Sequence, residues 1–155
     1  AAFERLWNKG MNINLVIVGK RGWMTEKLVE TISKHYELNK RLFWLDGASD
    51  EYLEILYDAC TCLINASEGE GFGLPIIEAA KHNLPIISRD IPVFREVAGE
   101  HAYYFNGLEP EAVEKCIKDW LSLYEKGKHP VSKNINWLTW KETAQQLLEK
   151  IGVIK

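Results

Sequence analysis

Cysteine and long apolar runs are both scarce in this sequence of 155 residues. The three cysteines, Cys60, Cys62 and Cys116, lack the paired spacing of a structural metal site, so we interpret them as small buried side chains in a reducing compartment. No segment approaches the roughly 18 apolar residues that a membrane-spanning helix needs, and no signal peptide is recognisable. The net charge of -3 argues against a general surface for nucleic acid or for anionic membranes.

Familiar nucleotide and metal motifs are also missing. The Walker pattern G-x-x-x-x-G-K-[ST] does not occur, and no G-x-G-x-x-G follows the first apolar run, so an ATPase and a dinucleotide dehydrogenase have no sequence support. Asp46 and Asp50 do not form a D-x-D pattern. His82 and His101 stand alone in the sequence, which favours ordinary surface or core histidines. We therefore expect no tightly bound metal.

Short β-rich runs alternate with helical patterns along the whole chain. The expected strands are 14–20, 41–47, 61–67, 84–90 and 102–105. An amphipathic helix ends near Gly10, and further helices are expected at 24–38, 50–59, 75–83 and 91–99, from Pro110, and from about Thr139. Because the strands are continuous apolar runs, they suit a sheet covered on both faces. We predict one α/β domain over 1–155, a Rossmann-like, doubly wound parallel sheet.

The C-terminal part of the sequence supports predictions about a connecting segment and the last helix. The segment 125–136 has the composition of a surface connection. Thr139 and Glu142 have the spacing of a capping box, which predicts the start of the last helix. The helical repeat predicts that the buried face of this helix is formed by Ala144, Leu147, Leu148 and Ile151.

The most informative stretch is SEGEGFGLPIIEAA, at residues 67–80. Its glycines allow tight curvature and close approach of a ligand to the main chain, and a helix that begins at Pro75 points its positive end into the same space. A phosphate or pyrophosphate fits such a place. Glu70 and Glu78 would repel a phosphate, so we expect them to accept hydrogen bonds from hydroxyl groups on either side of it, which a nucleotide sugar offers.

An ordinary structural explanation also exists for these residues. Glycine-rich turns between a strand and a helix are common, and a lone G-x-G pattern is weak evidence for a ligand site. Glu78 would equally be a favourable charge in the first turn of a helix. The pair of carboxylates on either side of the turn is the feature that favours the ligand site.

The segment EGFGLPIIE resembles the E-x7-E signature of the retaining family-four glycosyltransferases, which have the two-domain GT-B architecture. The resemblance covers nearly the whole chain. LVIVGK is similar to the first strand of the C-terminal domain, and residues 42–90 follow its order of strand, helix, strand, signature, helix and strand. Bacterial mannosyltransferases of surface-polysaccharide assembly are the most similar members. The resemblance implies the C-terminal, donor-binding half of such an enzyme, with a nucleotide sugar as substrate and no cofactor.

The resemblance also implies roles for individual residues. Glu70 matches the first Glu of the signature, which lies beside the donor sugar, and is the candidate catalytic residue. Glu78 matches the second Glu, which binds the ribose hydroxyls. The other candidate substrate-binding positions are the loop that meets the phosphates and sugar, and the region that flanks the base: Gly71, Phe72, Gly73 and Leu74, then Gly47 and Ala48. Asn83 stands where members often have Gly, and Asn tolerates the left-handed backbone of that turn.

Other parts of the enzyme are expected outside this chain. The family's Arg and Lys that neutralise the pyrophosphate, and its acceptor-binding N-terminal domain, would precede Ala1, whereas Lys20 and Arg21 fit a solvated basic turn. For Trp137 and Trp140 ordinary packing is the default expectation, and a contact that covers that domain is the alternative. We expect the full-length protein to transfer a hexosyl group, with mannose from GDP-mannose suggested, to a glycan or lipid-linked acceptor. We expect it in the cytoplasm or at the inner membrane face, and this chain alone to be inactive.

A second class of function stays open at this point, a flavodoxin-like signalling receiver domain without transferase activity. Asp46 ends a predicted strand, as a phospho-acceptor Asp does. A receiver also needs an acidic cluster after its first strand and a Lys after a late one, and this chain has GKRG and SRD in those places. Labelling of Asp46 by acetyl phosphate would favour this alternative.

Overall fold

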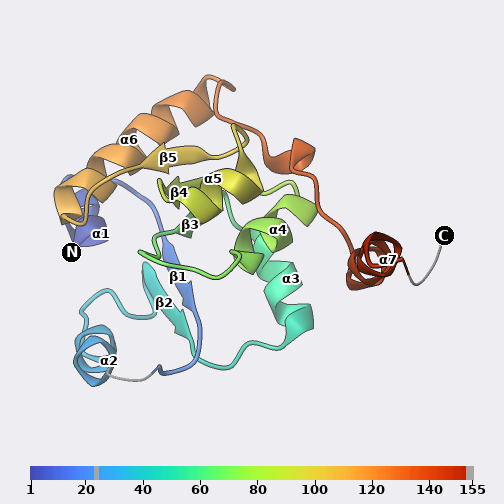
Figure 1. Cartoon of the computed structure of the whole chain (residues 1–155). Coiled ribbons are helices and arrows are strands. Elements are labelled where there is room, and N and C mark those ends of the chain that lie inside the picture. Colours follow the sequence, from blue (N-terminus) through green and yellow to red (C-terminus); the bar gives the residue numbers. More distant parts are fainter. Residues whose placement is uncertain (23–24, 153–155) are drawn as a thin grey trace.

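The computed structural model describes residues 1–22 and 25–152, and Figure 1 shows how their elements are arranged. The strands are β1 (Leu15–Val18), β2 (Leu42–Leu45), β3 (Leu63–Asn65), β4 (Ile86–Arg89) and β5 (Tyr103–Phe105). The helices are α1 (Ala2–Asn8), α2 (Glu26–Ser33), α3 (Asp50–Ala59), α4 (Leu74–Lys81), α5 (Pro92–Ala98), α6 (Pro110–Glu125), the short 3-10 helix η1 (Ser132–Asn134) and α7 (Trp140–Lys150). Every described strand lies within its expected range, so the alternating order is confirmed.

All described strand pairs are parallel, but they form two sheets. One sheet pairs β1 with β2, with Leu15 opposite Leu42. The other has the order β3-β4-β5, with Ile64 opposite Ile87. In the described part of the chain no ladder joins the two sheets, whereas the sequence led us to expect one. β3 spans only Leu63–Asn65, so it offers few backbone groups for a second ladder.

Helices cover both faces of the three-stranded sheet, as the continuous apolar runs predicted. On β4, Ile86 packs in a cluster with Ile76 of α4 and Phe94 of α5. The next residue, Ile87, packs on the opposite face with Trp120 of α6. Figure 1 shows α6 running along β5. The site-bearing helix α4 is therefore fixed to the sheet by an apolar core.

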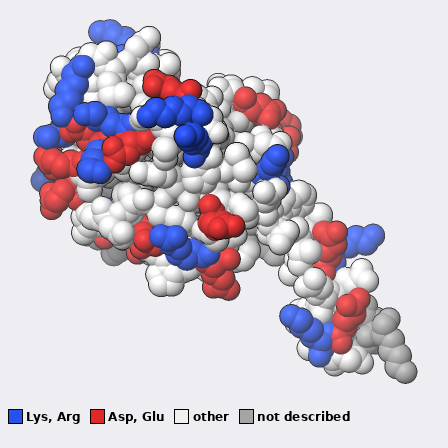
Figure 2. Space-filling view, turned by 90° about the horizontal axis from the view of Figure 1, so that it is seen from above, with Lys and Arg blue, Asp and Glu red and all other residues white. Residues whose placement is uncertain are grey.

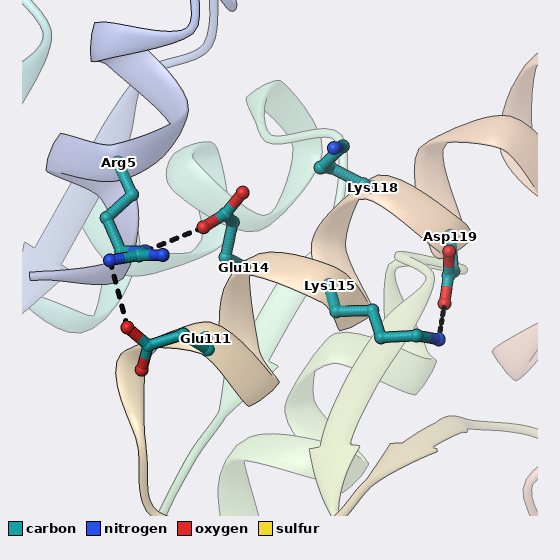
Figure 3. Close-up of a pocket in the computed structure, with 6 residues that line it drawn as sticks. All are labelled: Arg5, Glu111, Glu114, Lys115, Lys118 and Asp119. Atoms are coloured by element: carbon teal, nitrogen blue, oxygen red, sulfur yellow. Dashed lines mark hydrogen bonds and ion pairs between the residues drawn. The ribbon is translucent and has the colours of Figure 1, made fainter.

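The first helix is held to α6 by ion pairs. The nearly buried carboxylate of Glu114 accepts a hydrogen bond from Arg5 Nε at 2.7 Å and pairs with Lys9. Figure 3 shows Arg5 reaching both Glu114 and Glu111, the latter at 2.9 Å. The bonds from Lys9 and Arg5 hold the pKa of the Glu114 carboxyl below its ordinary value. This charged cluster is therefore already paired, and we interpret it as structural.

The helix expected at 24–38 is shorter than predicted. It ends at Ser33, and residue 24 lies outside the described residues. A turn with Asn39 at φ 59° brings Leu38 into a bridge with Leu42, which a continuous helix cannot do. Of the expected apolar stripe Ile32 is buried, whereas the side chains at 28 and 36 are both 58% exposed.

The C-terminal expectations are partly wrong. The segment 125–136 is not a loose connection, because Ser132 and Ile135 are buried and Ile135 joins the core cluster around α4. The Thr139 capping box is confirmed. The expected buried face of α7 is wrong: no residue of this helix is buried, and Leu147 is 60% exposed. The chain leads α7 away from the body, as Figure 1 shows, so the described residues provide no surface to cover it.

The surface charge and the hydropathy of the described helices bear on contacts with nucleic acid and membranes. On the described part of the face shown in Figure 2, basic and acidic side chains are interspersed and form no continuous basic patch. None of the described helices combines the length and the apolar character that crossing a bilayer would require.

Candidate active site

The segment 66–73 joins β3 to α4 and carries the first carboxylate of the signature. This connection follows the carboxyl end of a parallel strand, where α/β sheets bind their ligands. Glu70 is exposed, and among the described residues no side chain or backbone group holds its carboxylate in a hydrogen bond or ion pair. Its charge is therefore accessible to a ligand.

Gly73 makes the bend that ends this loop. It has φ 89° and ψ 45°, a left-handed conformation, and it is the N-cap of α4. Pro75, two residues later, lies in the first turn, and the N–H of Ile76 donates to the Gly73 carbonyl at 2.9 Å. A Cβ at Gly73 would lie 3.0 Å from a ring carbon of the buried Phe94. The sequence predicted a tightly curved stretch, and the structure shows that the left-handed bend lies at Gly73.

Replacing Gly73 with Ala is expected to destabilise the domain. The left-handed backbone and the contact with Phe94 together should lower the free energy of unfolding by about 1–3 kcal/mol. Denaturant unfolding would measure this loss. Gly69→Ala is the matched control, because a Cβ there meets nothing within 4 Å. Equal stability of the two variants would show that the bend tolerates a side chain.

Glu78 lies in the second turn of α4, so the interpretation as a charge in the first turn is wrong. Its side chain is partly buried, and the hydroxyl of Tyr57 on α3 donates to Glu78 Oε2 at 2.8 Å. Burial, and then the bond to Glu78, raise the pKa of the Tyr57 phenol. The phenol therefore stays protonated and remains a donor to the carboxylate near neutral pH.

A second contact joins the same two helices. His82, one turn after Glu78, pairs through Nδ1 with Asp58 Oδ1 at 2.6 Å, a contact that its isolated place in the sequence did not indicate. The Tyr57 and His82 rings stack, with centroids 5.5 Å apart and planes at 28°. Neighbouring residues of α3 thus contact Glu78 on α4 and His82, the residue that caps its C-terminal end. Sequence reasoning missed Tyr57 and Asp58, because nothing local to α3 indicates a contact with α4.

The remaining candidate residues lie in two loops that follow strands. Gly71 and Phe72 lie in the loop before α4 and Leu74 is the first helical residue, with Phe72 55% and Leu74 47% exposed. Both large apolar side chains are thus about half exposed, in the same stretch of sequence as Glu70. Gly47 and Ala48 follow β2, at the carboxyl end of a strand in the other sheet. Within the described residues, no hydrogen bond or ion pair links Gly47 or Ala48 to the signature.

The basic turn after β1 is solvated, as expected. Arg21 is exposed, with its Nε 3.6 Å from Asp46 Oδ2, and its guanidinium lies 5.6 Å from the centre of the Trp44 ring. Two surface grooves of about 270 and 410 Å³ in the described part of the chain are lined chiefly by residues of α1 and α6. Neither groove includes a residue of the loop before α4.

The sequence profile of the family described as "Glycosyl transferases group 1" matches residues 1–137. The chain belongs to this family. It is 56% identical, over 99% of its length, to the serotype-specific mannosyltransferase WbdA of Escherichia coli. It is 31% identical, over 75% of its length, to the O-antigen chain mannosyltransferase RfbU of Salmonella typhimurium. The domain spans only 19% of WbdA and 32% of RfbU.

Solved structures confirm the fold of this group 1 domain. Anabaena HepE, in complex with UDP and glucose, aligns with a TM-score of 0.74 at 17% identity, over 99% of this chain and 44% of that one. Sucrose-phosphate synthase from Thermosynechococcus elongatus aligns with a TM-score of 0.72 at 19% identity, over 98% and 42% of the two chains. The structural relatives are GT-B glycosyltransferases, and the receiver-domain alternative finds no support.

Proposed function

We propose that this domain binds the nucleotide-sugar donor of a retaining glycosyltransferase that transfers a hexosyl group to a growing glycan. The observation that carries the proposal is the arrangement of the two signature carboxylates around the Gly73 bend. Glu70 is exposed and unpaired among the described residues, whereas Glu78 is held on α4 by Tyr57. Membership of the glycosyl transferases group 1 family supports this assignment.

Each candidate residue has a place in this proposal. The main chain of 71–74 and the positive end of α4 meet the phosphates, and Glu78 accepts hydrogen bonds from the ribose hydroxyls. Glu70 faces the transferred sugar, where a carboxylate stabilises positive charge that develops as the nucleotide departs. Gly47 and Ala48 flank the base. The nucleotide sugar is a substrate in this scheme, and no cofactor or metal is required.

Mannose is the sugar that the relatives favour. WbdA and RfbU are named as mannosyltransferases, which supports mannose from GDP-mannose as the donor. HepE was solved with UDP. Titration of the full-length enzyme with GDP and with UDP would show which nucleotide it prefers. The relatives named for O-antigen chains also support a glycan or lipid-linked acceptor and a full-length enzyme in the cytoplasm, peripheral at the inner membrane face.

The proposal includes a second domain. Because the chain spans 19% of WbdA, the acceptor site and the cations that neutralise the pyrophosphate are assigned to the rest of the protein. The exposed apolar residues of the C-terminal part fit a contact with that N-terminal domain. Trp140 is 82% exposed and Trp137 is 40% exposed. Exposed aromatic side chains of this size often mark a surface that contacts another protein or domain.

The domain without the rest of the protein is expected to lack transferase activity. Acceptor binding and closure over the donor need a second domain, so the 155-residue chain should transfer no sugar from GDP-mannose or a UDP-hexose. The measurement is glycan formation from radiolabelled donors. The full-length enzyme, assayed beside it, should be active with one of these donors. Transfer by the short chain would contradict the two-domain proposal, and inactivity of the full-length enzyme with every donor would contradict the proposed function.

A further inference from the structure

We propose that Tyr57 is a positioning residue for nucleotide binding: its hydroxyl fixes the Glu78 carboxylate so that the second carboxylate oxygen is presented to the ribose. The inference rests on the proposed function of Glu78 and adds a residue that lies on another helix, outside the signature. It is carried by the hydrogen bond from the Tyr57 hydroxyl to Glu78 Oε2, at 2.8 Å.

The contact restrains a side chain that otherwise has many rotamers. Within the described residues, Tyr57 is the one hydrogen-bond partner of the Glu78 carboxylate, and it engages Oε2. Oε1 is left for a ligand. A carboxylate that is held in one orientation before binding loses less side-chain entropy when the ribose arrives, so the preorganised site binds more tightly.

Tyr57 itself is held in place. It is half-buried and packs against the core cluster that contains α4. Its ring stacks on His82, and the His82 imidazole is paired with Asp58 at 2.6 Å. Two contacts between α3 and α4 therefore fix the position of the phenol relative to Glu78. A hydroxyl on a ring that is restrained in this way can set the orientation of its partner.

Removing the Tyr57 hydroxyl tests this role without removing the ring. Tyr57→Phe keeps the stacking on His82 and loses only the bond to Glu78. In the full-length enzyme we expect the Kd for the nucleoside diphosphate, and the KM for the donor, to rise by roughly 3- to 10-fold. The kcat should stay within about twofold, because the bond contributes equally to the ground state and the transition state.

A double-mutant cycle separates positioning from a general structural effect. Calorimetry with GDP or UDP, whichever the wild type binds, would compare Tyr57→Phe, Glu78→Ala and the double variant. Glu78→Ala leaves Tyr57 no carboxylate to orient, so adding Tyr57→Phe should then cost no further affinity. Tyr104→Phe is the matched control, since its hydroxyl donates to the carbonyls of Phe94 and Gly99, away from Glu78. It should leave nucleotide affinity unchanged.

The outcomes distinguish this inference from the proposed function. Wild-type affinity in Tyr57→Phe, together with weakened binding in Glu78→Ala, would overturn the positioning role and leave the function intact. Full additivity in the double variant would also overturn it, because the hydroxyl would then act elsewhere. Wild-type affinity in Glu78→Ala would contradict the ribose assignment itself, and the inference would fall with it.

Discussion

The variant Glu70→Gln of the full-length enzyme is expected to lose kcat by on the order of 100-fold or more, while its affinity for the nucleoside diphosphate stays within about twofold. Glu70 is exposed in the loop before α4 and has no partner among the described residues, so its charge is available to the transferred sugar. The interaction strengthens as charge develops in the transition state, and Gln keeps the shape of the side chain without the charge. Steady-state kinetics and calorimetry on the same preparation would measure both quantities.

The same loop provides a control for this experiment. Glu68 is exposed two positions earlier, and Glu68→Gln removes an equal charge from the same segment. It should leave kcat and nucleotide affinity unchanged. If both variants lost kcat equally, the effect would come from the net charge of the loop, and the specific role of Glu70 would be wrong.

The variant Glu78→Gln is expected to weaken nucleoside diphosphate binding by roughly 10- to 100-fold. A hydrogen bond to a charged acceptor contributes about 1.5–3 kcal/mol, and each 1.4 kcal/mol corresponds to about a factor of ten in Kd. Tyr57 holds the Glu78 side chain in place on α4, whereas Glu70 is exposed on the loop. A carboxylate that is held in place suits a residue that binds the ribose of the nucleotide. Isothermal titration calorimetry would give the Kd, with Glu96→Gln on α5 as a control of equal charge.

The two substitutions are most informative together. The account predicts that Glu70→Gln changes mainly kcat, because Glu70 meets the transferred sugar. It predicts that Glu78→Gln changes mainly Kd, because Glu78 meets the nucleotide. Loss of nucleotide binding in Glu70→Gln, with wild-type binding in Glu78→Gln, would reverse the assignment. A parallel loss of both quantities in both variants would show that the carboxylates act as one unit.

The order of the elements was predictable because it depends on local patterns. Continuous apolar runs predicted the strands, and the Thr139 capping box predicted where α7 begins, since its bonds are made within one turn. Burial was less predictable, because it depends on which other elements pack against a given face of a helix or strand. The apolar stripe of α7 is a correct helical pattern, yet the described residues leave Ile151 62% exposed. Periodicity identifies a face and does not identify its partner.

The site shows the same division between local and tertiary information. Three glycines within residues 67–80 predicted a bend, but only the structure shows that Gly73 is the one where a Cβ would crowd Phe94. The bond from Tyr57 to Glu78 spans 21 positions and depends on how α3 packs against α4, so no motif could reveal it. The pairing of His82 with Asp58 depends on the same packing.

A structure of the full-length enzyme with bound GDP-mannose tests the central claim most directly. The account predicts that the pyrophosphate lies at the N-terminus of α4, over the main chain of 71–74. It also predicts hydrogen bonds from the ribose hydroxyls to Glu78, whose other oxygen stays on the Tyr57 hydroxyl, and a hexose beside Glu70. A donor bound elsewhere, for example along the charged groove between α1 and α6, with both carboxylates of the signature left free, would contradict the account.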